Sequence, residues 1–557
     1  MNPYRDRKHS LGSGSGSATS TGEPSTPNVA QELVASLLDP RSYPHAPTEV
    51  TLVQTHISLV FLAGTEVFKL KKAVRFSFLD FSTLERRRHF CEEEVRLNRR
   101  LAPGVYLGVV PITRVGNDYR VGGPGEPVEY AVHMRRLPTN LSLRALVERG
   151  EADDALMQRI AEKMAAFHAQ ADTSPEITAN GNVEALLGTV DENFTNLEPF
   201  AEWMDDDANL EDLRELLPSA IARVSDRLRQ RQRAGRVRDC HGDLRPDHVC
   251  CAEALPIFDC IEFNSRFRHC DVASEMAFLA MELEFLGAPM LAKALIEHYI
   301  EASGDTDLSD VLPVFRAYRA QVRAMVSGLT SREQEIEPAA RERCRDEARR
   351  YLALAARSAW SGHAPLILAM AGISGTGKST VAAALTDRTG FAWVRSDLVR
   401  KRMAGLASFD RPATPAAAAE LYAPTRSAAV YETLTGEADA LTRAGHGVVI
   451  DATFQRRADR ERVRQTAART GARLFWLECR APLETVRERL ALRARRRDDP
   501  SDATWAVAEP QARDFEPLDE VPPSEHLILE TGRGTDAARE ARRRLVQRLA
   551  AAARGVS

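Results

Sequence analysis

The segment from Gly372 to Thr380 constrains the fold of this chain more than any other. It reads Gly-Ile-Ser-Gly-Thr-Gly-Lys-Ser-Thr and so completes the pattern G-x-x-x-x-G-K-[ST]. The apolar run 366–371 before it has the length of a strand, and an Ala-rich segment with helical spacing follows it. In that order, a strand, a glycine loop and a helix direct backbone N–H groups and the positive end of a helix at one anion. The sequence therefore predicts a binding site for a nucleoside triphosphate.

Individual residues of this loop have predicted roles. Lys378 is expected to reach the β- and γ-phosphates, and the Ser379 hydroxyl is expected to bind Mg²⁺. The predicted ATP-binding residues of the loop are Gly372, Ser374, Gly375, Thr376, Gly377, Lys378, Ser379 and Thr380. The cofactors that the sequence predicts are therefore ATP and Mg²⁺.

Length and charge limit the alternatives. The chain has 557 residues, which suggests roughly three or four domain-sized units. Its 75 basic and 79 acidic side chains nearly cancel, so the whole-chain charge gives no argument for nucleic-acid or anionic-membrane binding. No apolar run approaches the roughly 18 to 20 residues that cross a bilayer. The polar N-terminus has no apolar signal-peptide core, so we expect a cytoplasmic protein with no membrane partner.

Eight cysteines are present, and a cytosolic setting predicts that they stay reduced. Five of them lie close together in the sequence with three histidines, at Cys240, His241, His248, Cys250, Cys251, Cys260, His269 and Cys270. A zinc site is conceivable there, but no C-x-x-C pair occurs. Because free cysteine is among the most buried residue types, small core residues are the favoured interpretation.

Composition divides the chain into three parts. We predict a disordered tail over residues 1–28, a first domain over 29–357 and a second domain over 363–557. In the second domain, apolar strand candidates alternate with helical patterns, which favours a mostly parallel sheet with its ligand at the carboxyl ends of the strands. The strand candidates are 366–371, 391–394, 447–450, 474–477 and 527–529.

Two acidic positions follow predicted strands of the second domain. Asp451 ends an apolar run, the usual placement for a carboxylate that orients Mg²⁺. Asp397 and Arg400 are three residues apart and would share one face of a helix start. The carboxylate could take the proton of an attacking hydroxyl while the guanidinium neutralises phosphate charge. A helix N-cap for Asp397 and a loop residue or cap for Asp451 remain the alternatives.

These residues, together with an Arg-rich stretch from Arg487 to Arg497, resemble P-loop kinases of the zeta-toxin, gluconate-kinase and polynucleotide-kinase group. The resemblance covers about residues 364 to 535. It implies that Asp397 is a candidate base and that Arg400 is a ligand for substrate or phosphate. The stretch of arginines would then serve as a mobile lid, with an exposed basic helix as the alternative. Acceptors in this group include sugars, nucleotide sugars and nucleic-acid ends, so the acceptor stays open.

A second motif lies in the first domain. The segment Cys240 to His248 reads Cys-His-Gly-Asp-Leu-Arg-Pro-Asp-His and resembles the catalytic loop of aminoglycoside phosphotransferases and protein kinases. The resemblance implies that Asp243 accepts the proton of the acceptor hydroxyl and that Asp259, after a short apolar strand, binds metal. Upstream, it implies a phosphate-contacting lysine at Lys69, with Lys71 as the alternative, and a partner glutamate at Glu94. The segment from Asp271 onward resembles the structural helix behind the catalytic loop.

The first domain departs from that family in two ways. His248 replaces the metal-binding Asn, and imidazole suits Mg²⁺ less well than oxygen does; His248 is kept as a candidate metal ligand. No glycine-rich phosphate loop is visible near residues 54–64. A kinase-shaped domain that turns nothing over is therefore an alternative for this half.

The fold expected is a two-domain chain. The first domain is an α+β protein-kinase-like, aminoglycoside-phosphotransferase-like bilobal fold, and the second is an α/β P-loop NTPase with a mostly parallel sheet. The leading hypothesis is an ATP-dependent kinase that phosphorylates a hydroxyl of a small molecule, with a nucleotide site in each half. The alternatives are a nucleotide-responsive regulator and a nucleic-acid 5′-end kinase. The sequence leaves the acceptor, the coupling of the halves and the oligomeric state open.

Overall fold

The computed structural model describes residues 27–55, 57–76, 79–116, 118–204, 208–333, 336–410, 414, 420–495, 500–532 and 534–553. The predicted tail lies outside these residues except for its last two. Contacts divide the chain into two compact units. The first comprises Met1–Leu186, Arg227–Phe315 and Ser331–Cys344, and the second comprises Leu187–Asp226, Arg316–Thr330 and Arg345–Ser557.

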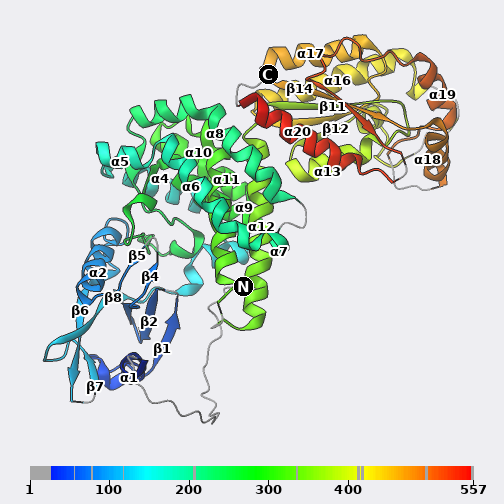
Figure 1. The fold of residues 1–557 in the computed structure, drawn as a ribbon. Coiled ribbons are helices and arrows are strands. Elements are labelled where there is room, and N and C mark those ends of the chain that lie inside the picture. The colour runs from blue at the N-terminus through cyan, green and yellow to red at the C-terminus, as the bar shows by residue number, and fades with distance from the viewer. Residues whose placement is uncertain are drawn as a thin grey trace. The chain divides into compact units, whose positions relative to one another are not determined.

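A six-stranded antiparallel sheet forms the first part of unit one (Figure 1). Its strand order is β1-β2-β3-β8-β6-β7. The strands are β1 (Val50–Gln54), β2 (Ser58–Ala63), β3 (Glu66–Lys71), β6 (Tyr106–Val115), β7 (Asp118–Val121) and β8 (Pro127–Arg135). Successive side chains of β3 point to opposite faces, and Val67, Phe68 and Leu70 are all buried, so both faces of this strand are covered; α2 (Leu84–Asn98) packs against β8 and β6. Helix α2 begins at an N-cap, Thr83, whose side chain accepts the Arg86 N–H.

The rest of unit one is mainly helical and carries a short two-stranded sheet, in which β9 (Val237–Asp239) pairs with β10 (His269–Asp271). The catalytic-loop motif lies directly after β9. Helix α9 (Val272–Phe285) is apolar on nearly every side and fully buried over most of its length, which identifies it as a core helix. The other helices of this region are α1 (Pro27–Leu37), α3 (Leu143–Glu148), α4 (Asp154–Gln170), α5 (Pro175–Asn180) and α10 (Pro289–Ser303).

Unit two contains a five-stranded parallel sheet in the order β12-β13-β11-β14-β15. The strands are β11 (Leu366–Ala371), β12 (Ala392–Arg395), β13 (Gly447–Asp451), β14 (Arg473–Arg480) and β15 (His526–Glu530). Figure 1 shows α13 (Lys378–Thr389) and α20 (Ala537–Ala553) on one face of this sheet and α16 (Pro424–Arg443) and α17 (Arg457–Thr470) on the other. The parallel sheet predicted for the second domain is confirmed, and each strand candidate forms a strand.

The remaining helices of this region matter for the site. They are α14 (Ser396–Met403), α18 (Leu483–Arg495) and α19 (Trp505–Asp514). The other α-helices in the described residues are α6 (Val183–Leu197), α7 (Ala201–Met204), α8 (Asn209–Arg233), α11 (Leu308–Thr330) and α12 (Pro338–Ser361). One core cluster beside the parallel sheet buries the large side chains of Phe454 and Trp476, each of which contributes about 1.5–3 kcal/mol. Among the residues described, no helix combines the length and apolar character that crossing a bilayer requires.

Candidate functional site

The glycine loop lies between β11, which ends at Ala371, and α13, which begins at Lys378. Gly372, Gly375 and Gly377 have φ values of 129°, 85° and 85°, which L side chains rarely adopt. A Cβ at position 375 would also lie 3.0 Å from Leu490 Cγ and from Val486 Cγ1. The backbone conformation therefore requires glycine at the motif positions 372 and 377 and also at 375, where close packing adds a second reason.

Lys378 is buried at the start of α13. Its Nζ donates a hydrogen bond of 2.8 Å to the carbonyl of Ile373, within its own loop. Burial lowers the pKa of Lys378, and the negative charge of Asp451, together with that of Asp397, opposes this effect. Lys378 is thus held at the loop, and the carboxylates of Asp451 and Asp397 are close enough to raise its pKa.

Asp451 ends β13 and lies opposite Arg395 of β12 in the sheet register. Its side chain is buried, and its Oδ2, 3.7 Å from Arg395 Nε, has no hydrogen-bond partner among the described residues. Burial raises the pKa of Asp451, while Lys378 and the Ser379 hydroxyl lower it. A buried carboxylate oxygen without a partner beside a hydroxyl is a donor set that Mg²⁺ prefers, so Ser379 and Asp451 fit that ion.

Asp397 and Arg400 lie on α14, as expected, but their environments differ. The N-cap of α14 is Arg395, so Asp397 stands inside the first turn and does not cap the helix. The Nη1 of Arg400 donates to Leu421 O at 2.8 Å and to Ser427 Oγ at 3.2 Å. Its guanidinium also lies 4.8 Å from the centre of the Tyr422 ring. Arg400 is therefore held by groups of the protein itself, beside the half-buried Asp397.

Part of the predicted arginine lid lies in the described residues. Arg489 of α18 donates to the Thr531 hydroxyl and carbonyl at the end of β15, beside Gly377 of the loop. Arg487 stacks on Trp505 of α19, at 5.5 Å from the ring centre. Arg496 and Arg497 lie outside the described residues. The two arginines thus tie α18 to β15 and to α19.

In unit one, both candidate lysines of β3 contact Glu94 of α2. Lys69 Nζ lies 2.8 Å from Glu94 Oε1 and 2.7 Å from Asp259 Oδ1. Lys71 Nζ lies 2.8 Å from Glu94 Oε2 and forms a second ion pair with Glu262. Lys71 and Glu94 are fully buried, whereas the Lys69 side chain is 16% exposed. Lys69 is therefore the lysine that pairs with Asp259, while Lys71 is fully buried.

Asp259 adopts a left-handed backbone conformation, with φ 65°, which is uncommon outside glycine and recurs at functional sites. Burial raises the pKa of Asp259, but the positive charge of Lys69 outweighs this and holds the pKa well below its usual range. His248 Nε2 lies 3.5 Å from Asp259 Oδ2. The structure therefore brings Lys69, Glu94, His248 and Asp259 together, as the resemblance implies.

Asp243 follows β9 in the catalytic-loop motif. Arg245 Nε donates to its Oδ1 at 2.9 Å, and His248 Nδ1 lies 3.4 Å from its Oδ2. His248 Nδ1 also lies 2.9 Å from the Asp243 carbonyl. His248 therefore stands between the Asp243 and Asp259 carboxylates. The motif did not predict that Arg245 pairs with Asp243, although the two residues are only two positions apart in the sequence.

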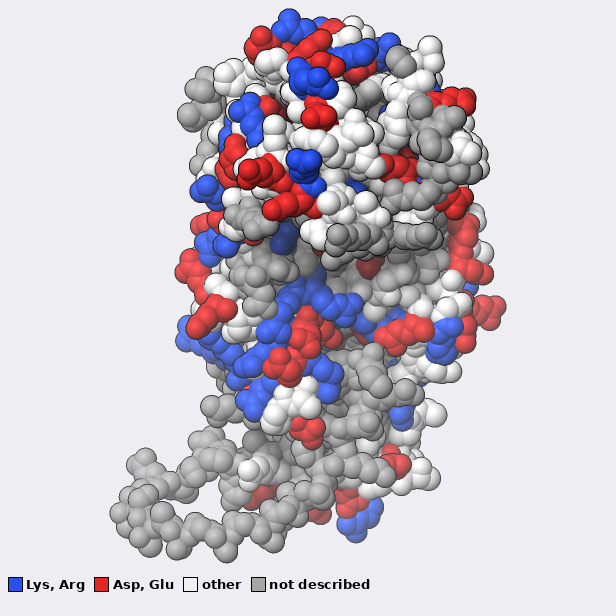
Figure 2. All heavy atoms as spheres, turned by 90° about the vertical axis from the view of Figure 1, so that its right-hand side faces the viewer, with Lys and Arg blue, Asp and Glu red and all other residues white. Residues whose placement is uncertain are grey.

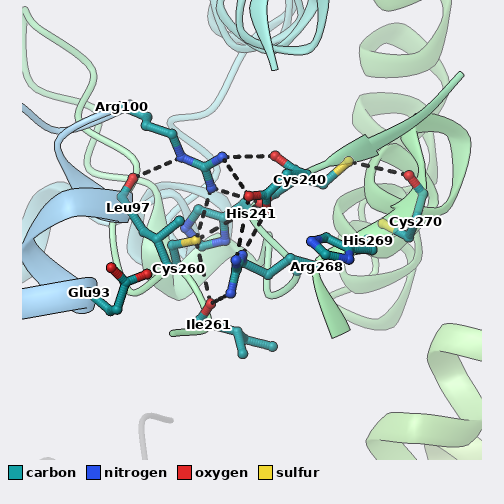
Figure 3. A network of polar contacts seen from close by, with 12 residues as sticks. Glu93, Leu97, Arg100, Cys240, His241, Cys260, Ile261, Arg268, His269 and Cys270 are labelled. Atoms are coloured by element: carbon teal, nitrogen blue, oxygen red, sulfur yellow. Dashed lines mark hydrogen bonds and ion pairs between the residues drawn. The ribbon is translucent and has the colours of Figure 1, made fainter. Parts of the chain in front are cut away.

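A network of polar contacts holds the catalytic loop from behind (Figure 3). Arg100, just after α2, donates to the carbonyls of Asp239 and Cys240 at 2.8 and 2.9 Å, and its Nη2 is 3.4 Å from Cys260 Sγ. Asn98 of α2 accepts the Cys260 N–H at 2.9 Å. These contacts tie the helix that carries Glu94 to both catalytic segments. No motif signalled them, because they link residues far apart in the sequence.

Glu275, in the first turn of α9, accepts the backbone N–H groups of His241 and Gly242. Asp271, which begins the segment that resembles the structural helix behind the loop, caps α9 and pairs with Arg231. Helix α9 therefore contacts the loop through Glu275.

Among the described residues, one group has ligand atoms close enough together to hold a metal ion, namely His168, Cys240 and Glu275, all buried; only Cys240 of these belongs to the cysteine-rich segment. His168 already contacts the Tyr299 hydroxyl at 2.8 Å and Glu275 at 2.9 Å. All eight cysteines are described, and none forms a disulfide. Of the five clustered cysteines, Cys240, Cys250 and Cys260 are buried, whereas Cys251 and Cys270 are half-buried.

Unit two thus combines a parallel sheet with a glycine loop of the P-loop pattern between β11 and α13. The family model described as an AAA domain matches residues 367–518, from β11 to the segment after α19. Among solved structures, a gluconokinase from Sinorhizobium meliloti 1021 is 16% identical, covers 34% of this chain and 95% of its own, and has a TM-score of 0.25. The GDP complex of aminoglycoside 2′-phosphotransferase-IIIa is 16% identical, covers 58% of this chain and 99% of its own, and has a TM-score of 0.33.

Closer relatives come from mycobacteria. A protein of Mycobacterium tuberculosis and one of Mycobacterium bovis, both described as uncharacterized, are 31% identical to this chain over 459 residues. The match covers 82% of this chain and 88% of each relative. This chain belongs to the family of those mycobacterial proteins.

Proposed function

We propose that this protein transfers the γ-phosphoryl group of ATP to a hydroxyl of a small-molecule acceptor, with one nucleotide site in each half. The observation that carries the proposal is the arrangement at the carboxyl edge of the parallel sheet. There the buried Lys378 lies within the electrostatic reach of Asp451 and Asp397, and Asp451 keeps one buried oxygen without a hydrogen-bond partner among the described residues. Phosphoryl transfer needs this combination of cation, metal ligand and nearby base.

In the C-terminal site, the loop amides and Lys378 would bind the phosphates, and Ser379 and Asp451 would hold Mg²⁺. The ion would supply compensation for the charge of the phosphoryl oxygens. Asp397 would orient the acceptor hydroxyl and accept its proton, because α14 places that carboxylate at the same edge of the sheet. Arg400, already fixed against Tyr422, would keep the acceptor side of the site positively charged.

In the N-terminal site, Lys69 would bind the phosphates and Glu94 would keep Lys69 in place through their 2.8 Å ion pair. Asp259 and His248 would provide the metal side of this site, and Asp243 would accept the proton of the acceptor. The Arg245 guanidinium, 2.9 Å from Asp243, would help to neutralise the phosphoryl group in transit.

One observation favours a second candidate, a nucleotide-responsive regulator with an inactive N-terminal domain. His248 contacts the Asp243 carbonyl through Nδ1 and faces Asp259 through Nε2, so an imidazole occupies the place between the two key carboxylates. An imidazole is a poorer Mg²⁺ ligand than an oxygen. This candidate keeps nucleotide binding in the P-loop domain but removes phosphoryl transfer from the other half.

A nucleic-acid end as acceptor has less support. On the face shown in Figure 2, Lys and Arg side chains are interspersed with Asp and Glu. A surface that tracks a phosphate backbone is expected to concentrate basic side chains instead. The proposal therefore names a small molecule as the acceptor.

The proposal is tested by incubating the full chain with γ-labelled ATP, Mg²⁺ and a collection of small hydroxyl compounds. The expected result is a product heavier by one phosphate group. Asp243→Asn and Lys378→Ala, tested separately, assign that product to one half or the other. Binding of ATP without transfer to any compound would favour the regulator, and single-stranded oligonucleotides labelled at their 5′ ends would revive the end-kinase alternative.

A further inference from the structure

One peptide unit of the glycine loop is held from both sides. The carbonyl of Ile373 accepts the ammonium of Lys378 and the hydroxyl of Thr376, each at 2.8 Å. The N–H of the same peptide unit, which belongs to Ser374, donates to Oε1 of Gln511 at 2.8 Å. The amide side chain of Gln511 therefore meets the loop 137 positions away in the sequence.

Gln511 lies on α19, and apolar contacts fix this helix against the loop. Ile373 packs with Val486 and Leu490 of α18 and with Ala508 of α19 in one buried cluster. The hydrogen bond from Ser374 to Gln511 adds a polar contact between the loop and α19. Packing thus sets where α19 lies, and the hydrogen bond sets how the peptide unit is turned.

The geometry of the peptide bond links the two sides. A trans peptide is planar, and its C=O and N–H point in opposite directions. An acceptor that holds the Ser374 N–H therefore also fixes the direction of the Ile373 carbonyl. That carbonyl is what holds the ammonium of Lys378, and a buried ammonium depends strongly on its acceptors.

We propose that Gln511 is a positioning residue for Lys378, acting through the peptide unit that joins Ile373 to Ser374. The inference rests on the proposed function, in which Lys378 binds the nucleotide phosphates. It adds that α19 is part of the phosphate site: when Gln511 holds the peptide unit, the lysine is aimed into the loop. Without that acceptor the peptide unit can rotate, and Lys378 loses its fixed direction.

Two substitutions separate the acceptor from the rest of the side chain. Gln511→Glu keeps an oxygen acceptor of the same reach, whereas Gln511→Met keeps the length but has no comparable acceptor. Gln465→Met on α17 is a matched control, since Gln465 is exposed and bonds only Glu461 among the described residues. All variants are made in the full chain carrying Lys69→Met, so that the C-terminal site dominates the binding signal.

The measurement is the affinity for ATP and for AMP by calorimetry. AMP lacks the phosphates that Lys378 would reach, so it reports on the fold of the site but not on the lysine. We expect Gln511→Met to weaken ATP binding by roughly fivefold to tenfold, the effect of one hydrogen bond, with AMP affinity unchanged. Gln465→Met is expected to stay within about twofold of the parent, while Gln511→Glu, which keeps an oxygen acceptor but adds a negative charge, is expected to fall between Gln465→Met and Gln511→Met.

Three results would overturn the inference. An unchanged ratio of ATP to AMP affinity in Gln511→Met would show that the lysine does not depend on Gln511. Equal losses for ATP and AMP would indicate a structural role, and a loss in Gln511→Glu equal to that in Gln511→Met would exclude the acceptor as the cause. Failure of the proposed function is distinct, because ATP affinity would then be unaffected by Lys378→Ala in the same background.

Discussion

The two candidate phosphate sites hold their key lysine in different ways. In the C-terminal site, Lys378 rests on the carbonyl of Ile373, five residues earlier in the same loop. In the N-terminal site, Lys69 is held by Glu94 and Asp259, which lie 25 and 190 positions away. The first site is therefore built from backbone within one short segment, and the second from side chains of distant segments.

The difference has a consequence for ligand binding. Backbone amides of a loop before a helix are oriented for an anion whether or not one is bound. The N-terminal charges instead neutralise one another, since Lys69 pairs with Asp259 and Arg245 pairs with Asp243. We therefore expect the C-terminal site to accept a nucleotide with little rearrangement, while the N-terminal site must exchange internal ion pairs for contacts with ligand.

The largest expected effect is a loss of phosphoryl transfer at the N-terminal site when its proposed base is replaced. Asp243→Asn should reduce phosphoryl transfer by the N-terminal site by two to four orders of magnitude, because loss of a general base typically costs that much. Nucleotide affinity should change little. Initial rates with labelled ATP measure the effect, with the exposed Asp154→Asn on α4 as the matched control. Equal transfer rates in Asp243→Asn and Asp154→Asn would show that the N-terminal half does not catalyse the transfer.

The next effect concerns the two lysines of β3. Lys71→Met leaves the buried Glu94 and Glu262 without their shared cation, so the free energy of unfolding should fall by about 3–5 kcal/mol. Lys69→Met, at a partly exposed position, should destabilise less and instead weaken nucleotide binding. Denaturant unfolding and calorimetry together test this division. A larger stability loss for Lys69→Met would reverse the assignment.

A smaller effect is expected in the C-terminal loop. Lys378→Ala should weaken ATP binding by about 1.5–3 kcal/mol, or ten- to hundredfold, the contribution of a hydrogen bond to a charged group. The loop amides would still bind phosphate, which keeps the loss moderate. Arg443→Ala, an exposed cation of α16, serves as control. Unchanged affinity in Lys378→Ala would contradict the assignment of the loop.

The smallest effect is a pH dependence in unit two. His363 is buried, and burial lowers its pKa to about 3, with Arg473 acting in the same direction. In the unfolded chain His363 takes up a proton near pH 6.5, whereas in the folded chain it stays neutral at that pH. The free energy of unfolding therefore has its full value above pH 6.5 and decreases as the pH falls toward 3. At pH 5 the loss should reach about 2 kcal/mol. In His363→Gln, the free energy of unfolding measured with denaturant should depend less on pH between 6.5 and 3. An unchanged pH dependence would show that other groups cause it.

The sequence predicted the C-terminal site better than the N-terminal one, for the same physical reason that separates them. The strand, the glycine loop and Lys378 are neighbours in the chain. The apolar run that ends in Asp451 likewise marks the carboxyl end of a strand in the parallel sheet. In unit one, a resemblance identified Asp243 and Asp259 and left Lys69 and Lys71 open. Only the fold shows that both lysines share Glu94 and that Lys71 is directed inward.

Other residues could not be predicted because their partners depend on tertiary packing. Asn98, Arg100 and Glu275 hold the segments around Asp243 and Asp259 through hydrogen bonds with backbone groups. Gln511 meets the Ser374 N–H only because α19 packs on the loop. Such side chains carry no spacing pattern, so a single sequence offers no signal for them.

The most direct test of the central claim is the number of nucleotides that one chain binds. Calorimetric titration with a non-hydrolysable ATP analogue and Mg²⁺ should give two sites per full chain. Lys378→Ala and Lys69→Met should each weaken a different one of these sites, and the double variant should weaken both. A single site per chain that neither substitution affects would contradict the account.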